Sequence, residues 1–262
     1  MISFFNLRNS ITAIAFLLLF LSCNTNTSNK NPIIAHRGAW KLDKLPENSI
    51  ASLKKAIELK CYGSEFDVHL TKDNIMVVNH DNDYMGLDIE SSTYQELIAY
   101  KLSNDEQLPT LKNYLKVGLK QNKTKLILEI KSAPSGVERT LQLTRMAVEL
   151  VHNLNGQPMV EYICFNYDAG LLIKELDPKA KVAYLNGDKS PEEVLKAGYT
   201  GINYNYKIYQ KNSTWIKKAQ DLGLTTNSWT VNKEEDMEQL LKQKINYITT
   251  NEPELLFRVL NN

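Results

Sequence analysis

The sequence predicts an α/β fold, a (β/α)8 TIM barrel over residues 32–262 with a short insertion between the second and third units. From residue 32 onward, short β-branched or apolar runs alternate with longer stretches of helical period. Counted in order, they give about eight strand-then-helix units in one domain-sized chain. No glycine-rich phosphate fingerprint follows the first apolar run, which argues against a dinucleotide-binding doubly wound sheet.

The first three elements illustrate the pattern. Residues 32–35 form an apolar run, residues 49–59 place their apolar side chains on one helical face, and residues 64–70 form a second strand. A turn at 72–74 predicts a hairpin with a strand at 75–79. Further strands are expected at 125–130, 159–165, 180–185, 201–204, 224–229 and 247–249, and helices at 136–154, 167–176, 191–197, 214–222 and 233–242.

The stretch from Asp81 to Asn113 lacks a clear period and is rich in Asp, Ser and Tyr. We therefore expect an irregular insertion that lies over the mouth of the barrel.

Composition excludes one class of partner. The chain has 262 residues with 31 basic and 30 acidic side chains, a formal net charge of +1. This balance offers no excess positive charge to hold a polyanion by counterion release, so we expect no nucleic acid partner.

The N-terminus resembles a bacterial lipoprotein signal. Arg8 precedes an apolar run at 11–21, and the small Ser22 stands directly before Cys23. Residues 1–22 are then a lipoprotein-type signal peptide, Cys23 is the lipidation site, and 23–31 are a flexible tether. The protein would be exported to the bacterial cell envelope, lipid-anchored and either periplasm-facing or surface-exposed. The alternatives are a plain signal peptide or a signal anchor, in which Cys23 is incidental.

The other two cysteines, Cys61 and Cys164, give no disulfide framework in a chain of this size. Neither has the basic neighbours of a reactive thiolate, so both are expected to be buried.

Polar residues end several predicted strands, where a barrel carries its active site. Glu65 and Asp67 are two apart on one strand, and Glu129 and Lys131 repeat that spacing on the next barrel strand. Carboxylates that converge in this way favour one divalent cation, Mg²⁺ or Ca²⁺. The alternative is a salt-bridge cluster that uses Lys131 and Arg37.

Two of the four histidines, His36 and His80, also stand at strand ends. Because histidine titrates near neutral pH, the pair could divide the roles of general acid and general base. His69 and His152 are expected to be surface or packing residues.

An ordered set of motifs runs through the chain. The set comprises His36-Arg37-Gly38, Pro46-Glu47-Asn48-Ser49, Glu65-Phe66-Asp67-Val68, Leu70-Thr71-Lys72-Asp73, Val77-Val78-Asn79-His80-Asp81, Leu108-Pro109-Thr110-Leu111, Leu128-Glu129-Ile130-Lys131, Trp229-Thr230-Val231-Asn232 and Ile248-Thr249-Thr250-Asn251-Glu252-Pro253. In this order, over residues 33–258, the chain resembles the glycerophosphodiester phosphodiesterase family.

The resemblance implies a barrel that cleaves a glycerophosphodiester to an alcohol and, commonly, glycerol 3-phosphate. It implies metal ligands, catalytic histidines, and substrate contacts from Arg37 and Lys131, with Glu47 behind them. Trp229 would form an apolar wall for the substrate, or else pack in the core. The resemblance implies that the metal ligands are Glu65, Asp67 and Glu129. It implies that His36 and His80 are the general acid and the general base, without deciding which is which.

Two departures from the family pattern stand out. Asn82-Asp83-Tyr84-Met85-Gly86 replaces a segment that usually contains Arg and Thr, and Asn251 stands where aspartate is common. The alternative functions are a lysophospholipase D-like enzyme acting on lysolipids, and a non-catalytic lipoprotein that binds a phosphorylated ligand or a partner protein.

Overall fold

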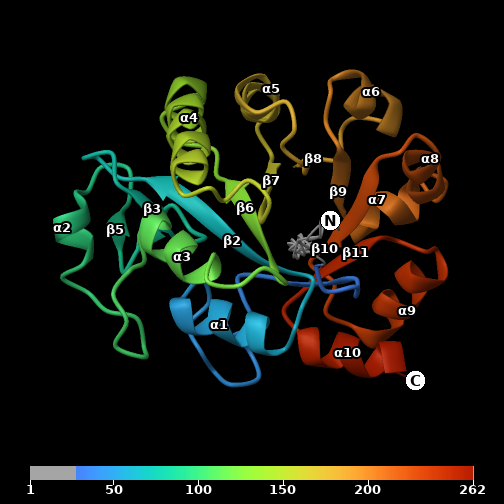
Figure 1. The fold of residues 1–262 in the computed structure, drawn as a ribbon, viewed down its shortest axis with the longest axis horizontal. Coiled ribbons are helices and arrows are strands. Elements are labelled where there is room, and N and C mark those ends of the chain that lie inside the picture. The colour runs from blue at the N-terminus through green and yellow to red at the C-terminus, as the bar shows by residue number, and fades with distance from the viewer. Residues whose placement is uncertain (1–27, 262) are drawn as a thin grey trace, which may run out of the picture.

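The computed structural model describes residues 28–261, and its centre is a closed barrel of parallel strands (Figure 1). The strand order is β1-β11-β10-β9-β8-β7-β6-β2, and pairing of β1 with β2 closes the ring. The strands are β1 (Ile33–Ala35), β2 (Gly63–Leu70), β6 (Lys125–Ile130), β7 (Val160–Cys164), β8 (Val182–Tyr184), β9 (Gly201–Asn205), β10 (Thr225–Trp229) and β11 (Tyr247–Thr250). The predicted fold class is confirmed.

Helices surround the barrel (Figure 1). They are α1 (Ile50–Glu58), α3 (Leu111–Gly118), α4 (Val137–Asn153), α5 (Tyr167–Leu176), α6 (Pro191–Lys196), α7 (Tyr206–Lys211), α8 (Trp215–Asp221), α9 (Glu234–Lys242) and α10 (Pro253–Asn261). Local sequence sets where several begin: Ser49 caps α1 in a reciprocal pair with Ser52, and Ser190 caps α6 with Glu193. The sequence pattern did not predict α3, α7 and α10.

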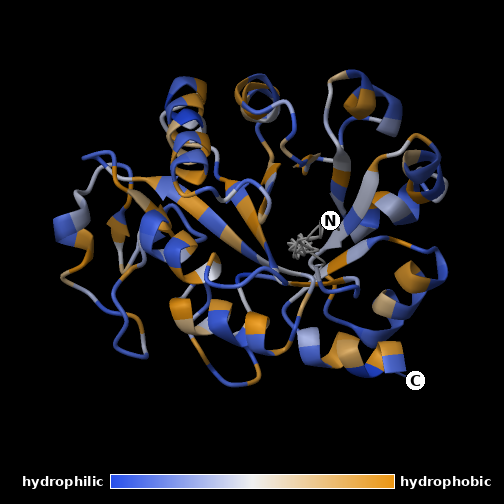
Figure 2. Ribbon diagram, viewed as in Figure 1, coloured by the Kyte–Doolittle hydropathy of each residue, from blue (hydrophilic) through white to orange (hydrophobic). Residues whose placement is uncertain are grey.

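Alternation along β2 separates the barrel interior from the outer core. Figure 2 shows the strand changing between hydrophobic and hydrophilic residues along its length. Phe66 and Val68 belong to the large core between strands and helices, whereas Glu65 and Asp67 face the barrel interior. Strand geometry therefore places two carboxylates inside the barrel, as expected.

The insertion differs from the prediction in two respects. It is ordered into a hairpin of β4 (Asp83–Tyr84) and β5 (Leu87–Asp88), followed by α2 (Tyr94–Leu97). It also lies at the flank of the barrel, beyond β2 and α3, rather than over the mouth (Figure 1). The reason is its own small core, which needs no cover from the barrel mouth. That core comprises Val77, Tyr84, Ile89, Leu97 and Leu108.

The predicted hairpin after β2 is present, with β3 (Met76–Val78) antiparallel to β2. The outer edge of β3 is occupied by the segment that ends the insertion. Val78 donates its N–H to the carbonyl of Pro109 at 2.8 Å, and Val77 bridges to Thr110.

The residues just before β1 are hydrogen-bonded to the rest of the domain. The amide of Asn29 donates to the carbonyl of Cys61 at 3.1 Å, and the amide of Asn31 donates to that of Lys60 at 2.8 Å. Within the predicted tether, residues 29 and 31 are therefore hydrogen-bonded to the domain.

The signal peptide, Cys23 and the rest of the tether lie outside the described residues. In residues 28–261, no helix is long and apolar enough to span a bilayer. Cys61 and Cys164 are free and buried, as predicted, and burial raises the pKa of each thiol to about 12.

Candidate active site

A pocket opens at the carboxyl ends of the barrel strands and collects most of the predicted site residues. Its walls combine charged and apolar side chains from all eight barrel strands or the loops directly after them. The lining residues are His36, Arg37, Glu65, His80, Glu129, Lys131, Ile163, Phe165, Leu185, Asn203, Trp229, Thr230 and Thr249.

Three buried carboxylates meet in this pocket. Glu65 and Asp67 come from β2, and the parallel register sets Asp67 directly beside Glu129 of β6. One oxygen from each of the three lies within 4.8 Å of the other two. Asp67 does not line the open pocket itself but lies directly beneath it, 1% exposed.

Two cations balance part of this charge. Lys131 places its Nζ 2.9 Å from Glu129 Oε1 and 3.2 Å from Asp67 Oδ1. Arg37 pairs with Glu47 at 2.8 Å through one terminal nitrogen, while its Nε lies 4.0 Å from Asp67 Oδ2. Glu47 thus contacts the outer side of Arg37.

The backbone around Arg37 is also specialised. Its N–H donates to Glu65 Oε2 at 2.8 Å, and Arg37 itself has a positive φ of 57°. Gly38 follows with φ 83°, and a Cβ there would approach Ser52 Oγ to 2.4 Å. The His-Arg-Gly turn therefore depends on glycine at its third position.

Burial and mutual repulsion shift the carboxylates in different directions. Burial, then the charge of Asp67, raises the pKa of Glu129 to about 7. Burial and the neighbouring carboxylates also raise the pKa of Glu65. Burial acts in the same upward direction on Asp67, but Lys131 and other positive neighbours outweigh it and lower its pKa.

This donor set fits a hard divalent cation. Three carboxylates converge, whereas in residues 28–261 the lysine and arginine side chains within ion-pair distance of them are Lys131 and Arg37. Glu65 Oε1 is buried and has no hydrogen-bond partner among the described residues. A metal ion with oxygen ligands would supply the partner that this carboxylate oxygen lacks, beside the two other carboxylates.

The two histidines occupy different surroundings. His36 Nδ1 lies 2.7 Å from Asn251 Oδ1, and its Nε2 lies 3.9 Å from Glu65 Oε2. Burial, then the charge of Arg37, lowers the pKa of His36 to about 4. His80 is more exposed, and its Nδ1 lies 2.7 Å from Asp81 Oδ1.

His69 and His152 lie outside the pocket, in agreement with the prediction. His69 is buried, and its Nε2 donates to the carbonyl of His80 at 3.1 Å, so it holds the backbone that carries the catalytic candidate. His152 pairs with Asp177 at 3.1 Å, where α4 meets the loop before β8.

Two asparagines contribute to the site although neither was selected from the sequence. Asn48, 3% exposed, donates to Asp67 Oδ2 at 2.9 Å and so orients that carboxylate. Asn251 accepts from His36 and receives support through its own N–H, which donates to Asn232 at 2.9 Å. Both belong to motifs of the ordered set, and membership of those motifs was the feature of the sequence that could have identified them.

One wall of the pocket is apolar. Phe165 and Trp229 meet edge to face with ring centroids 5.5 Å apart, and Trp229 donates its Nε1–H to the carbonyl of Asn203 at 2.8 Å. Trp229 lines the pocket and also packs against the interior cluster.

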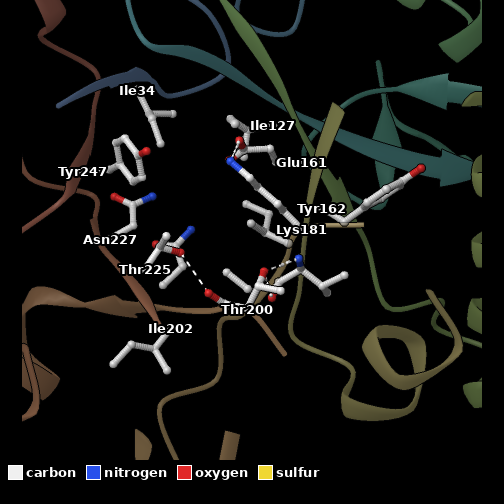
Figure 3. Close-up of a pocket in the computed structure, with 14 residues that line it drawn as sticks. Ile34, Ile127, Glu161, Tyr162, Lys181, Thr200, Ile202, Thr225, Asn227 and Tyr247 are labelled. Atoms are coloured by element: carbon white, nitrogen blue, oxygen red, sulfur yellow. Dashed lines mark hydrogen bonds and ion pairs between the residues drawn. The ribbon is translucent and has the colours of Figure 1, made fainter. Parts of the chain in front are cut away.

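A second cavity lies at the opposite end of the barrel interior (Figure 3). Its charged group, Glu161, accepts from Lys181 Nζ at 3.1 Å and from Tyr62 Oη at 2.8 Å. Tyr62 stacks on Tyr247 with centroids 4.1 Å apart. These contacts pair the charged side chains of Glu161 and Lys181 at the amino end of the barrel.

The comparison with known families agrees with this geometry. Residues 36–255 match the model of the glycerophosphoryl diester phosphodiesterase family. The chain belongs to this family. The matched range begins at His36 and includes all the pocket residues described above.

Individual members of the glycerophosphoryl diester phosphodiesterase family cover nearly the same span. A glycerophosphodiester phosphodiesterase from Caldanaerobacter subterraneus subsp. tengcongensis is 29% identical over 249 residues, 88% of this chain and 98% of the relative. A crystal structure of a glycerophosphodiester phosphodiesterase from Parabacteroides distasonis is 44% identical, with a TM-score of 0.86 over 89% of this chain and 98% of that one.

A phosphodiesterase from Oleispira antarctica, solved in complex with the product sn-glycerol-3-phosphate, shares the fold. It is 23% identical, with a TM-score of 0.73, and the match covers 88% of this chain and 97% of that chain. The protein is therefore a phosphodiesterase of this family, and its pocket holds an acidic group able to bind a metal ion.

Proposed function

We propose that this phosphodiesterase hydrolyses glycerophosphodiesters to glycerol 3-phosphate and an alcohol. One Mg²⁺ or Ca²⁺ ion would be held by Glu65, Asp67 and Glu129. The observation that carries the proposal is a pair of unsatisfied buried groups in the site. Glu65 Oε1 lacks a donor and Arg37 Nε lacks an acceptor among the described residues. A cation satisfies the first and a phosphate oxygen satisfies the second.

The cation, when bound, neutralises phosphate charge and stabilises the negative charge that develops during displacement. Arg37 and Lys131 add fixed positive charge at the same side of the pocket. Lys131 keeps its charge because the adjacent carboxylates raise its pKa despite burial.

His36 and His80 would move the two protons of the reaction. Water adds its oxygen to phosphorus and loses a proton to one histidine, while the ester oxygen that leaves gains a proton from the other. Asn251 and Asp81 each fix one imidazole through its Nδ1, so both histidines have an oriented Nε2 available for this work. The apolar wall of Phe165 and Trp229 would receive the less polar part of the substrate.

The test measures phosphate-ester release from glycerophosphocholine, glycerophosphoethanolamine and lysophosphatidylcholine, with EDTA and after readdition of Mg²⁺ or Ca²⁺. Chelator-sensitive cleavage that is lost in His36→Ala and His80→Ala supports the proposal. Preference for the lysolipid would replace the proposed substrate with the lysophospholipase D alternative. Absence of activity on all three with either ion would contradict catalysis and favour the ligand-binding alternative.

The two histidines can be distinguished with a diester whose leaving group is p-nitrophenolate. This group needs little protonation, so the variant that lacks the general acid should regain most of its rate on this substrate. The variant that lacks the general base should remain slow. Equal recovery of both variants would contradict a division of roles.

We propose further that the protein is exported and lipid-anchored through Cys23. The support is the order of the basic, apolar and small residues before that cysteine. Incorporation of a labelled fatty acid into the full chain, absent in Cys23→Ala, would support the anchor. Equal incorporation in both chains would contradict it.

A further inference from the structure

The loops that lead into the barrel strands carry an unusual excess of positive charge. They comprise residues 28–32, 59–62, 119–124, 154–159, 177–181, 197–200, 222–224 and 243–246. Asp177 is the one acidic residue in these ranges, and it is paired with His152. Seven lysines, all exposed, lie in the same loops: Lys30, Lys60, Lys120, Lys123, Lys179, Lys181 and Lys244. We call this surface the lysine face.

The charge is specific to this end of the barrel, because the whole chain has a formal net charge of only +1. In the loops that leave the strands, including the insertion, acidic residues outnumber basic ones. Among the described residues, no carboxylate lies within ion-pair distance of Lys60, Lys120, Lys179 or Lys244. Internal pairing therefore does not use up the charge of the face.

The start of the described chain is fixed to the same face. The N–H of Asn29 donates to the carbonyl of Lys123 at 3.0 Å, and the side chain of Asn31 bonds to the backbone of Lys60 and Tyr62. A shallow surface pocket opens there, lined in part by Lys30, Lys60 and Lys123. Positive charge and the point where the chain enters the domain thus coincide.

The sequence ahead of that point supplies the second, independent observation. The apolar run ends at Leu21 and Cys23 follows, five residues before Ser28. Five residues extend over at most about 18 Å, and seven over about 25 Å. An apolar or lipidated segment inserted in a bilayer would hold the lysine face close to the head groups.

From these two observations we infer that the lysine face docks on an anionic phospholipid bilayer. Each lysine near such a surface favours binding by about fivefold, and one lipid anchor with a basic patch gives stable attachment where either alone is weak. The active-site pocket opens at the other end of the barrel and faces away from the membrane. This orientation suits diesters dissolved in water over lipids that remain in the same bilayer.

The experiment uses the full chain in vesicles that contain lipids with a quencher on the head group. A fluorophore is attached at Gln157→Cys, in an exposed loop of the lysine face, or at Asn186→Cys, in an exposed loop at the pocket end. Cys61 and Cys164 are buried, and the parent chain without an introduced cysteine gives the blank for Cys23.

In phosphatidylglycerol vesicles, the label at position 157 should be strongly quenched and the label at 186 should not. The variant K60E/K120E/K179E/K244E should lose most of that quenching, as should neutral phosphatidylcholine vesicles. The matched control K72E/K101E/K207E/K233E makes the same charge change on exposed lysines that follow strands, and should retain it.

Equal quenching at both labels, stronger quenching at 186, or quenching at 157 that survives charge reversal would overturn the inference. The last result would mean that the N-terminal segment alone sets the orientation. Catalysis is not the readout, so failure here and failure of the proposed hydrolysis are separate outcomes.

Discussion

His36 and Asn251 are joined by a contact of 2.7 Å between Nδ1 and Oδ1, at the rim where β1 and β11 end side by side. An amide oxygen accepts a hydrogen bond but carries no formal charge, so it orients the ring without stabilising the imidazolium as a carboxylate would. Burial and the charge of Arg37 outweigh the opposing effects of the Asn251 contact and of Asp67, and they lower the pKa of His36 to about 4.

Asn251→Asp should raise the pKa of His36 by about one to two units, since an opposite charge favours the protonated ring. The limb of the kcat/KM profile that reports His36 should move to higher pH by that amount. Asn104→Asp, on an exposed loop, adds the same charge far from the ring and should leave the profile unchanged. An unmoved limb in Asn251→Asp would show that the contact does not govern His36.

Cation binding should depend on pH through Glu129. Without a cation, its pKa is raised to about 7 from an ordinary value of 4.5, so the folded protein binds more protons than the unfolded chain between these pH values. The free energy of unfolding contributed by this group therefore falls as pH rises through that window. A cation must displace the proton, so its affinity should weaken about tenfold per pH unit below 7.

Calorimetric titration with Mg²⁺ and Ca²⁺ between pH 5 and 8 measures this dependence. Glu129→Gln should bind the cation more weakly throughout and with a flatter pH dependence. A wild-type affinity that is constant over the range would contradict a raised pKa for Glu129.

Lys131→Met should destabilise the cation-free protein by about 3–5 kcal/mol, because it leaves Asp67 and Glu129 buried together without their shared partner. Addition of a divalent cation should recover part of the loss. Urea unfolding with EDTA, and again with the cation, measures both effects. Lys125→Met removes a lysine from the same strand that contacts only a carbonyl, and should cost much less.

Glu106 ties the insertion to the start of α1. Its two carboxylate oxygens accept from the backbone N–H groups of Ile50 at 2.9 Å and Ala51 at 3.1 Å. Glu106→Ala should lower the free energy of unfolding by about 1–2 kcal/mol, as loss of a helix N-terminal partner does. Glu96→Ala, which removes a cap from the short exposed α2, is the comparison. Equal small losses would contradict a special role for Glu106.

The local pattern was sufficient to predict the barrel and most of its elements. β6 and α5 begin and end at the predicted residues, since each has a clear period and clear ends. The convergence of Glu65 and Asp67 followed from a spacing of two on a strand, and polar residues such as His36 and Lys131 at the ends of strands indicated the pocket.

What the pattern could not supply depends on contacts distant in sequence. Asn251 and its partner His36 are separated by 215 positions in the sequence, and Glu106 is separated from the start of α1 by more than fifty. The small core of the insertion was also missed, because its apolar residues follow neither a helical nor a strand period. The hydrogen bonds of Asn29 and Asn31 to the domain were not predicted, because polar residues near a terminus are typical of a linker.

The occupied outer edge of β3 has a consequence for how the family can diverge. Pro109 and Thr110 return to cover that edge. The segment between His80 and Pro109 therefore begins and ends beside β3 and has a core of its own. Evolution can lengthen, shorten or rewrite its tip without exposing an unpaired strand to neighbouring molecules. The departure at Asn82-Asp83-Tyr84-Met85-Gly86 falls on that tip, where change costs the barrel least.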